Sequence, residues 1–447
     1  MKTSMRSIFL FSIVLLIGIQ SNAQAKKWTL QECIKHALEN NISIKQSELD
    51  VTATEIEKLS AIGNFIPSLN GNGSYSVNSG ASINPVTNAF ENETFASFTT
   101  GFNSSITLFD GLRNVRTLQR AKISKLASEY RLDKMKDDIS LLVANAYLNI
   151  LNNRANLVAV TSQNEVTLQQ IQRTNDLVDA GVLPRGDLLE IEATNASERQ
   201  RIVAAENAVT LSRVSLAQLL LVKDYANFDI ASDDYEIIDE GYASKPVSEI
   251  IASAQENRSE VKIAEENVSL AVKDLQIARG AYYPTISGFF SYSTRYTDND
   301  FFNRSFTEQL YQNDGTGYGL QLSVPVLNGF AARSNVKRNI VNLERTKFQL
   351  EQTKLDLESS VYQAYVDANA AMKSYEAALA SLQSQELAYQ YAKDRYDVGL
   401  TNAFDFNQSK VRYDNAVIES NRSKYDYIFK TKVLELYFGV PATELKF

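Results

Sequence analysis

The chain has 447 residues, a formal charge of −8 at pH 7, one histidine and one cysteine. The acidic balance argues against nucleic acid as a partner, because the phosphate backbone is bound mainly by lysine and arginine. The single histidine and the single cysteine nearly exclude a His/Cys metal cluster and a disulfide within the chain. Since the sequence also lacks a glycine-rich phosphate loop, we expect a protein that is not an enzyme and that carries no metal and no cofactor.

The first residues have the pattern of an export signal. Lys2 and Arg6 precede an apolar run from Ile8 to Ile19, and small residues suit cleavage after Ala23. We therefore expect residues 1–23 to be a signal peptide, whose removal changes the formal charge from −8 to −10. No later run approaches the roughly 20 apolar residues of a membrane-spanning helix, so a mature chain that crosses a bilayer would have to use strands.

The chain repeats one plan at an offset of 217 to 218 residues, which indicates a tandem duplication. The matching segments are Ile66-Pro67-Ser68-Leu69 with Tyr283-Pro284-Thr285-Ile286, Leu108-Phe109-Asp110-Gly111 with Val326-Leu327-Asn328-Gly329, and Asp179-Ala180-Gly181 with Asp397-Val398-Gly399. We predict a first copy at 28–236, an acidic linker at 223–245 with Asp233, Asp234 and Glu236, and a second copy at 246–447.

The first copy predicts the order helix, strand, strand, helix, helix. A helical stretch at about 30–62 precedes two segments of alternating polarity, at about 66–77 and 97–109, which we predict to be strands. Residues 112–180 contain neither glycine nor proline and predict one helix of roughly 100 Å. A shorter helix is predicted at about 187–222.

The second copy predicts the same order, with a helix at about 247–279, strands at about 285–297 and 317–327, a long helix at about 330–398 and a shorter one at about 402–438. Both long helices carry apolar residues at coiled-coil spacing, which a fibrous or dimeric coiled coil would also show. However, the short helices of each copy add up to the length of one long helix. This favours a tube that the long helices span, in which the short helices meet at mid-height and the linker forms a belt.

The four predicted strands each have one mostly apolar and one small polar face. In the second strand Phe98 and Phe102 alternate with Thr99. Each strand is long enough to cross the hydrocarbon core at a tilt near 45°. The polar loops 78–96 and 298–316 suit the outside of a barrel. The strands of a soluble β-sandwich also alternate in polarity, but four strands are too few for a good sandwich.

Four strands do not close a barrel, and an open edge in lipid leaves backbone groups unpaired. Other copies of the chain must therefore supply strands. A dimer is the lower bound, since the smallest barrels have about eight strands, and a trimer gives twelve. A helical tube that continues such a barrel is a duct.

Further motifs are the Trp28-Thr29-Leu30 opening, the Ala37-Leu38-Glu39-Asn40-Asn41 segment, and a proline, Pro67 or Pro284, before the first strand of each copy. Together with the repeat, these motifs resemble the TolC family of outer-membrane efflux proteins across residues 28–447. The resemblance implies an α+β membrane protein, a homotrimer with four transmembrane β-strands per protomer. These strands would complete a 12-stranded β-barrel in the outer membrane lipid, continued by a periplasmic α-helical coiled-coil barrel.

The implied function is that of a passive exit duct of a tripartite efflux pump or a type I secretion system, for small molecules or exported polypeptides. Its implied partners are a periplasmic adaptor protein and an inner-membrane transporter, either proton-driven of the RND type or ATP-driven of the ABC type. A trimeric coiled-coil surface adhesin or structural spacer is the alternative, but it would not need two duplicated strand pairs.

In this family the helix-turn-helix tips contact the adaptor and close the tunnel. The resemblance carries the tip role to Gly181, Val182, Leu183, Pro184, Gly399, Leu400 and Thr401. It makes Asp405, and Asp187 with Glu190 in the first copy, candidates for an acidic gate. Gln408 stands where some relatives have a second acid, which weakens the expectation of a cation-binding ring. The plainer alternatives are that the glycines cap helices and that the aspartates favour helix N-termini.

Overall fold

The computed structural model describes residues 27–83, 89–231, 241, 245–300 and 302–441. The predicted signal peptide and three linker acids, Asp233, Asp234 and Glu236, lie outside the described residues. The chain forms two compact units. We call Met1–Gln46, Asp133–Arg258 and Asp356–Phe447 the tip unit, and Ser47–Leu132 and Ser259–Leu355 the sheet unit.

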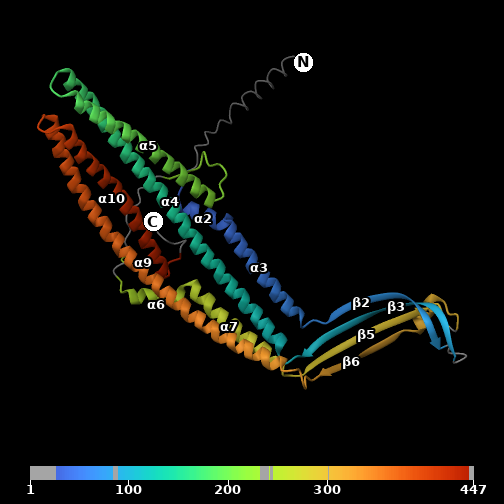
Figure 1. The fold of residues 1–447 in the computed structure, drawn as a ribbon. Coiled ribbons are helices and arrows are strands. Elements are labelled where there is room, and N and C mark those ends of the chain that lie inside the picture. Colours follow the sequence, from blue (N-terminus) through green and yellow to red (C-terminus); the bar gives the residue numbers. More distant parts are fainter. Residues whose placement is uncertain (1–26, 84–88, 232–240, 242–244, 301, 442–447) are drawn as a thin grey trace, which may run out of the picture. The chain divides into compact units, whose positions relative to one another are not determined.

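Two long helices, α4 (Arg113–Asp179) and α9 (Ala331–Asp397), contain 67 residues each and contribute to both units (Figure 1). Their bounds lie within one residue of the predicted ones, because the glycine-free and proline-free stretches offer no earlier stop. Each is followed by a shorter helix, α5 (Arg185–Leu219) or α10 (Ala403–Phe438). Among the described residues no helix has both the length and the apolar content that a membrane crossing requires.

The helices predicted at 30–62 and 247–279 are each interrupted. The structure has α2 (Leu30–Asn40) and α3 (Ile42–Gly63) in the first copy, and α6 (Val247–Asn257) and α7 (Ser259–Gly280) in the second. The interruption is one extended residue, Asn41 or Arg258, with ψ 133° in both. The Asn41 side chain accepts a hydrogen bond from the backbone N–H of Ser43 at 2.9 Å and so caps α3. A one-residue break hardly disturbs helical periodicity, which is why the sequence pattern misses it.

Three of the four predicted strands have different bounds in the structure. The strands are β2 (Ser68–Ile83), β3 (Phe90–Phe109), β5 (Thr285–Thr297) and β6 (Gly315–Ser323). Most of the predicted loop 78–96 is paired strand, because antiparallel pairing satisfies the backbone of polar residues as well as apolar ones. The predicted loop 298–316 contains a short helix, α8 (Phe306–Gln312). β6 ends at Ser323 rather than 327, since Pro325 has no N–H for the ladder.

The strands form one antiparallel sheet in the order β2-β3-β5-β6. Its register brings the apolar sides of all four strands onto one face. This apolar face carries Leu69, Tyr75, Val77, Phe98, Phe102, Ile106, Ile286, Phe290, Tyr292, Tyr296, Tyr318, Leu320 and Leu322. The opposite, polar face carries Asn70, Asn72, Ser74, Ser76, Thr99, Asn103, Ser105, Ser287, Ser291, Ser293, Arg295 and Gln321, with Phe95 and Phe289 as apolar exceptions.

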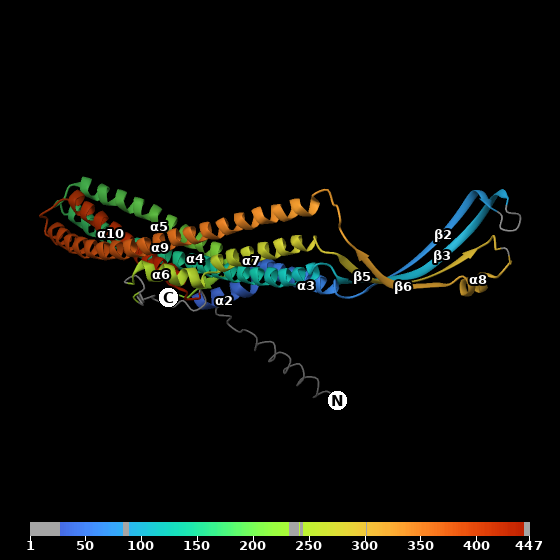
Figure 2. The same cartoon turned by 90° about the horizontal axis from the view of Figure 1, so that it is seen from below.

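The helices of the sheet unit form a layer in the order α3-α4-α7-α9, and two views agree on this order (Figures 1 and 2). Lys125 of α4 pairs with Glu55 of α3 at 3.1 Å, and Arg120 of α4 pairs with Asp274 of α7 at 2.6 Å. An apolar cluster that includes Leu275 joins α7 to α9. The sheet has the same order as the helix layer. The strands β2, β3, β5 and β6 are neighbours in the chain of α3, α4, α7 and α9, respectively. The outer helices α3 and α9 therefore correspond to the edge strands β2 and β6.

In the tip unit two short strands, β1 (Lys27–Trp28) and β4 (Asp229–Ile230), pair in parallel. The Tyr147 hydroxyl of α4 is fully buried and donates to backbone carbonyls beside both strands, those of Trp28 and Ala231, at 3.3 and 3.1 Å. This contact ties the start of the described chain and the segment after α5 to the same helix.

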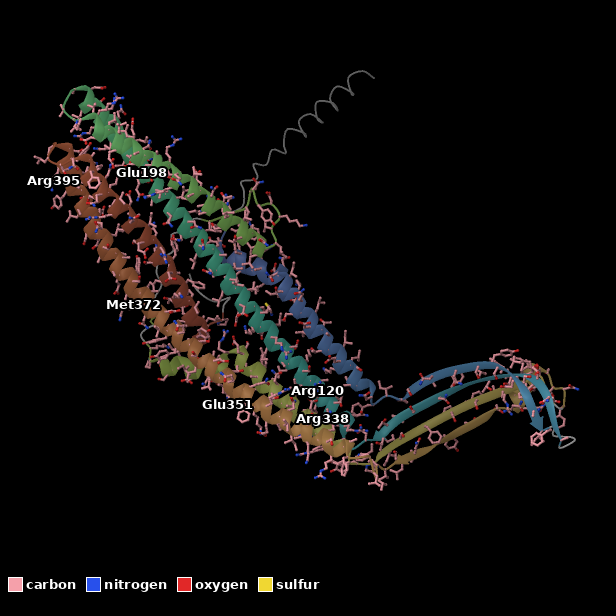
Figure 3. The ribbon with its side chains drawn as sticks, viewed as in Figure 1. Arg120, Glu198, Arg338, Glu351, Met372 and Arg395 are labelled. Atoms are coloured by element: carbon pink, nitrogen blue, oxygen red, sulfur yellow. The ribbon has the colours of Figure 1, made fainter. Side chains whose placement is uncertain are left out.

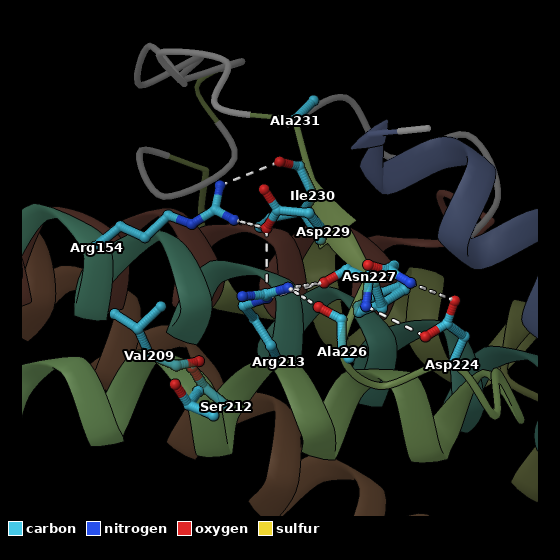
Figure 4. A network of polar contacts seen from close by, with 12 residues as sticks. Arg154, Val209, Ser212, Arg213, Asp224, Ala226, Asn227, Asp229, Ile230 and Ala231 are labelled. Carbon is cyan, nitrogen blue, oxygen red and sulfur yellow. Dashed lines mark hydrogen bonds and ion pairs between the residues drawn. The ribbon is translucent and has the colours of Figure 1, made fainter. Parts of the chain in front are cut away.

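Two arginines hold the segment after α5 in place (Figure 4). The Asp229 carboxylate contacts the guanidinium groups of Arg154 from α4 and Arg213 from α5. Arg154 also donates to the carbonyl of Ile230 at 3.1 Å, and the Arg213 Nε donates to that of Phe228 at 2.9 Å. The carboxylate therefore balances two half-buried cations that come from different helices.

We expect Asp229→Ala to lower the free energy of unfolding by about 1–2 kcal/mol, because it removes the carboxylate that both arginines contact. The thermal midpoint of the far-ultraviolet circular dichroism signal measures the change. Glu249→Gln is the control, since Glu249 makes an exposed pair with Lys245 at 3.5 Å and should change stability by less than about 0.5 kcal/mol. Equal midpoints for the two variants would show that Asp229 does not hold this segment.

Candidate functional site at the hairpin tips

The tip unit contains two helical hairpins, α4–α5 and α9–α10, and their turns have the same geometry. Gly181 has φ +74° and Gly399 has φ +75°, in the left-handed region. The next N–H reaches back to a carbonyl of the last helical turn, from Val182 to Leu177 and from Leu400 to Arg395, both at 2.8 Å. Both turns are Schellman caps, so the plain structural interpretation of the two glycines is confirmed.

The residues beside these glycines differ in exposure. Val182 is 65% exposed and Leu400 is 71% exposed. Leu183, to which the resemblance also carries the tip role, is half-buried, because the chain turns back there towards α5. Pro184 is the N-cap residue of α5, and the Thr401 hydroxyl donates to Asp405 Oδ2 at 3.3 Å. Each tip therefore presents one exposed aliphatic side chain directly after its glycine.

The three candidate gate acids lie near the start of the second helix of each hairpin. Asp187 is in the first turn of α5 and Asp405 is in the first turn of α10, where its N–H donates to Asn402 Oδ1 at 2.8 Å. Glu190 and Asp405 are exposed, and Asp187 is half-buried. Within the described residues none of the three forms an ion pair, and no contact brings them together in one chain. A ring of these acids therefore requires several copies.

The two hairpins pack on each other just inside the tips. Tyr396 of α9 and Phe406 of α10 stack at 5.1 Å in an apolar cluster with Ile191 of α5. The Tyr396 hydroxyl is 3.0 Å from that of Thr174 on α4, in a buried hydrogen bond. Arg173 of α4 pairs with Asp397 of α9 at 3.0 Å. These contacts connect the first hairpin to the second.

A buried charge cluster lies deeper in the same interface. Lys410 of α10 is 2.5 Å from Glu198 of α5, and their side chains are 3% and 8% exposed. Glu198 is labelled on α5 in Figure 3. Lys410 also contacts Asp414 Oδ2 at 3.3 Å, and Asn164 of α4 donates to Glu198 Oε2 at 3.0 Å. Burial raises the pKa of Asp414 to about 6, although Lys410 beside it acts in the opposite direction. The cluster holds two acids and one cation, and it joins the hairpins by a direct ion pair.

A cavity of about 320 Å³ adjoins this cluster and is lined by Gln163, Tyr389, Tyr413 and Asp414, among others. The rings of Tyr389 and Tyr413 stack at 5.2 Å with 5° between their planes. Burial, and then the charge of Asp414, raise the pKa of Tyr389 to about 12. Both tyrosines therefore stay neutral hydrogen-bond donors at physiological pH. Within the described part of the chain, no group of three or more His, Cys, Asp or Glu side chains is placed to hold a metal ion.

A family model described as outer membrane efflux protein matches residues 33–220 and 250–439, a stretch in each half of the chain. The chain belongs to this family. The resemblance predicted from the sequence motifs is therefore confirmed.

Several known proteins are similar to this chain. Protein CyaE of Bordetella pertussis is 21% identical over 258 residues, which cover 58% of this chain and 53% of CyaE, so the match spans about half of that relative. The outer membrane protein TolC of Vibrio cholerae is 22% identical over 309 residues, 67% of each chain. The crystal structure of the CmeC outer membrane channel of Campylobacter jejuni has a TM-score of 0.80 and 19% identity, with coverage of 92% of this chain and 85% of CmeC. The last likeness confirms the predicted efflux-protein fold.

The contacts between the hairpins of this efflux protein were partly visible in its sequence. Leu382, Tyr389 and Tyr396 recur at the coiled-coil spacing predicted for the second long helix. Asn164 stands at the position of the first long helix that matches Leu382, at the offset of 218 residues. Glu198 and Lys410 do not lie at these coiled-coil positions. From the sequence alone, a charged residue in a polar helix is expected to be exposed to solvent. Only the packing of one hairpin on the other buries them.

Proposed function

We propose that the chain is a subunit of an outer-membrane exit channel that acts by passage rather than by catalysis. The observation that carries this proposal is the two-faced sheet, open at both edges and adjoined by helices of the same order. An apolar face suits lipid, and a face of Ser, Thr, Asn and Gly suits a water-filled lumen. CmeC, a structural relative, is described as an outer membrane channel.

The sheet edges support closure by other copies of the same chain. In the described residues β2 pairs only with β3, and β6 only with β5, so each has one unpaired side. An unpaired strand edge in lipid costs several kcal/mol per backbone group. If β2 of one copy pairs with β6 of the next, the contact is head-to-tail and generates a ring. Three copies give the twelve strands that we propose.

The outer helices carry matching apolar stripes. On α3, Ile42, Leu49 and Ile56 recur at every seventh position and are 57%, 67% and 62% exposed. On α9, Val341 and Phe348 begin a second stripe of the same spacing and are 69% and 73% exposed. Exposed heptad residues are typical of a helix that packs on another helix. We therefore propose that α3 of one copy packs on α9 of the next.

We expect the pair Leu49→Cys with Phe348→Cys to form covalent trimers with a flexible bismaleimide, because α3 and α9 lie at opposite sides of one protomer and meet only between copies. Denaturing gel electrophoresis measures the product. The natural Cys33 is fully buried and should not react. Each single variant is the control and should stay monomeric, since a head-to-tail contact never brings a residue onto itself. Dimers from the single variants would indicate a two-fold interface instead.

The hairpin tips would form the periplasmic entrance. We propose that Asp405, with Asp187 and Glu190, forms an acidic gate when three copies meet. We also propose that Val182 and Leu400, with their tip turns, contact a periplasmic adaptor protein linked to a proton-driven or ATP-driven inner-membrane transporter. The support is the position of the acids at the tip turns and the exposed aliphatic side chain at each tip.

Conductance in planar lipid bilayers tests both the channel and its gate. We expect the purified wild type to produce discrete conductance steps that a multivalent cation blocks. Asp405→Ala should weaken this block roughly tenfold, equivalent to about 1.4 kcal/mol. Gln408→Ala, three residues on and also exposed, is the control and should keep the wild-type block. Unchanged block in Asp405→Ala would remove the gate proposal, whereas the absence of steps in every variant would contradict the channel.

A further inference from the structure

We propose that α8 is an aromatic anchor that lies in the outer headgroup region of the membrane. This inference rests on the proposed function, since it takes the apolar face of the sheet to be the lipid face. The exposed side of α8 would then contact the outer leaflet of the bilayer.

Aromatic packing holds the first turn of α8 against the sheet, and a side-chain cap fixes where the helix begins. Phe306 packs on Phe98 and Tyr296, with ring centroids 6.0 and 5.0 Å away. Phe98 and Tyr296 are register partners on β3 and β5, and both belong to the apolar face. The Ser305 side chain caps the helix by accepting from the N–H of Glu308 at 3.3 Å. The helix therefore lies over the apolar face.

Polar contacts then hold α8 against the end of β5. Gln309 is 1% exposed, and its side chain bonds both the N–H and the carbonyl of Thr297, at 2.9 and 3.0 Å. The Thr294 hydroxyl donates to the carbonyl of Leu310 at 2.7 Å. A fully buried glutamine with both ends of its amide satisfied fixes one position for the helix. Consequently α8 is a defined part of the fold rather than a loosely attached loop.

The strand geometry gives the depth of α8. The segment Thr285–Thr297 has 13 residues, and about 9–11 tilted residues cross the hydrocarbon core. Because β5 begins directly after α7, its other end at Thr294–Thr297 is the external one. That end, where α8 packs, falls at the outer boundary of the hydrocarbon layer. Aromatic side chains are enriched at this level of membrane proteins.

The exposed side of α8 is suited to such a boundary. Tyr311 of α8 is 84% exposed, and Phe302, which precedes the helix by four residues, is 72% exposed. Arg304 pairs with Asp300 at 2.5 Å, and its hydrogen bonds lower the pKa of that carboxyl to about 2. Since this cation is already paired with Asp300 and Glu308 also lies near it, anionic lipid gains little attraction here. Contact through the aromatic rings therefore does not require a charged lipid.

A neighbouring copy of the chain fits this surface less well than lipid does. The unpaired edge of β6 takes a neighbour in the plane of the sheet. In contrast, α8 contacts Phe98, Thr294 and Tyr296 on the inner strands β3 and β5. It therefore stands off the sheet on the side that we assign to lipid.

Depth-dependent quenching of tryptophan fluorescence tests this placement. The chain has one tryptophan, so Trp28→Phe gives a silent background. Three matched variants are made in it: Tyr311→Trp on α8, Tyr318→Trp in the middle of the apolar face, and Tyr225→Trp in the tip unit. These tyrosines are 84%, 81% and 46% exposed, so the larger ring fits each site. Each protein is placed in phosphatidylcholine nanodiscs whose acyl chains carry bromine either near the headgroup or near the chain end.

We expect Tyr311→Trp to emit at shorter wavelength than Tyr225→Trp and to be quenched more by shallow than by deep bromine. Tyr318→Trp should be quenched more by deep bromine, and Tyr225→Trp by neither. If Tyr318→Trp is quenched and Tyr311→Trp is not, or if Tyr311→Trp prefers deep bromine, the anchor inference is overturned and the channel proposal stands. If Tyr318→Trp is not quenched, the proposed lipid face itself fails, and the anchor fails with it.

Discussion

Lys410→Met is expected to lower the free energy of unfolding by about 3–5 kcal/mol, because it leaves two buried acids without their cation. Lys410 is 2.5 Å from Glu198 and 3.3 Å from Asp414, and all three side chains are at most 8% exposed. Methionine fills a similar volume, so the loss arises from charge rather than from a void. The unfolding transition, followed by far-ultraviolet circular dichroism in detergent, measures the change.

Lys430→Met is the matched control on the same helix. Lys430 pairs with Asp367 at 3.2 Å, but both side chains are about one-third exposed. Its loss should cost no more than about 1 kcal/mol. The double variant Lys410→Met with Glu198→Gln should recover part of the stability, since it removes one of the uncompensated charges. A similar shift in Lys410→Met and Lys430→Met would mean that the buried pair does not hold the hairpins together.

Asp414→Asn is expected to stabilise the protein at pH 8 by up to about 3 kcal/mol and to leave it unchanged near pH 4. Burial raises the pKa of Asp414 from the ordinary 3.8 to about 6 in the folded state. The stability that follows from this raised pKa is fully present below pH 4 and is lost as the pH rises through 6. Asparagine has nearly the same shape and does not ionise. The variant therefore keeps at high pH the folding stability that the wild type loses.

Unfolding midpoints between pH 4 and pH 8 measure this effect. The difference between variant and wild type should grow over the interval from 4 to 6 and then stay level. Asp426→Asn on the exposed side of α10 is the control and should show no comparable gain. A wild type that is as stable as Asp414→Asn at pH 8 would contradict the assigned burial of this carboxyl.

Much of the fold follows from simple sequence patterns. The absence of glycine and proline predicts α4 and α9 to within one residue, because nothing in those stretches competes with the helix. Alternation predicts that there are strands, but not where they end. The pairs from Asn78 with Phe95 to Ile83 with Phe90 extend β2 and β3 through residues without alternating polarity. These extensions are stabilised by backbone hydrogen bonds between the strands, which do not depend on a pattern of side-chain polarity.

The candidate site could be predicted in outline only. Gly181 and Gly399 mark the hairpin turns because the left-handed conformation there favours glycine. The contacts that connect the hairpins, such as Lys410 with Glu198, join residues 212 positions apart. No local pattern brings such residues together, since their burial depends on how one hairpin packs on the other.

The number of chains in the detergent-extracted particle is the most direct test of the central claim, which is that copies of this chain close one another's open sheets into a single pore. Native mass spectrometry of the purified wild type measures this number. The proposed channel predicts three chains per particle, with no single chain that survives extraction intact. A stable single chain in detergent, or a protein that leaves the membrane fraction without detergent, would contradict it.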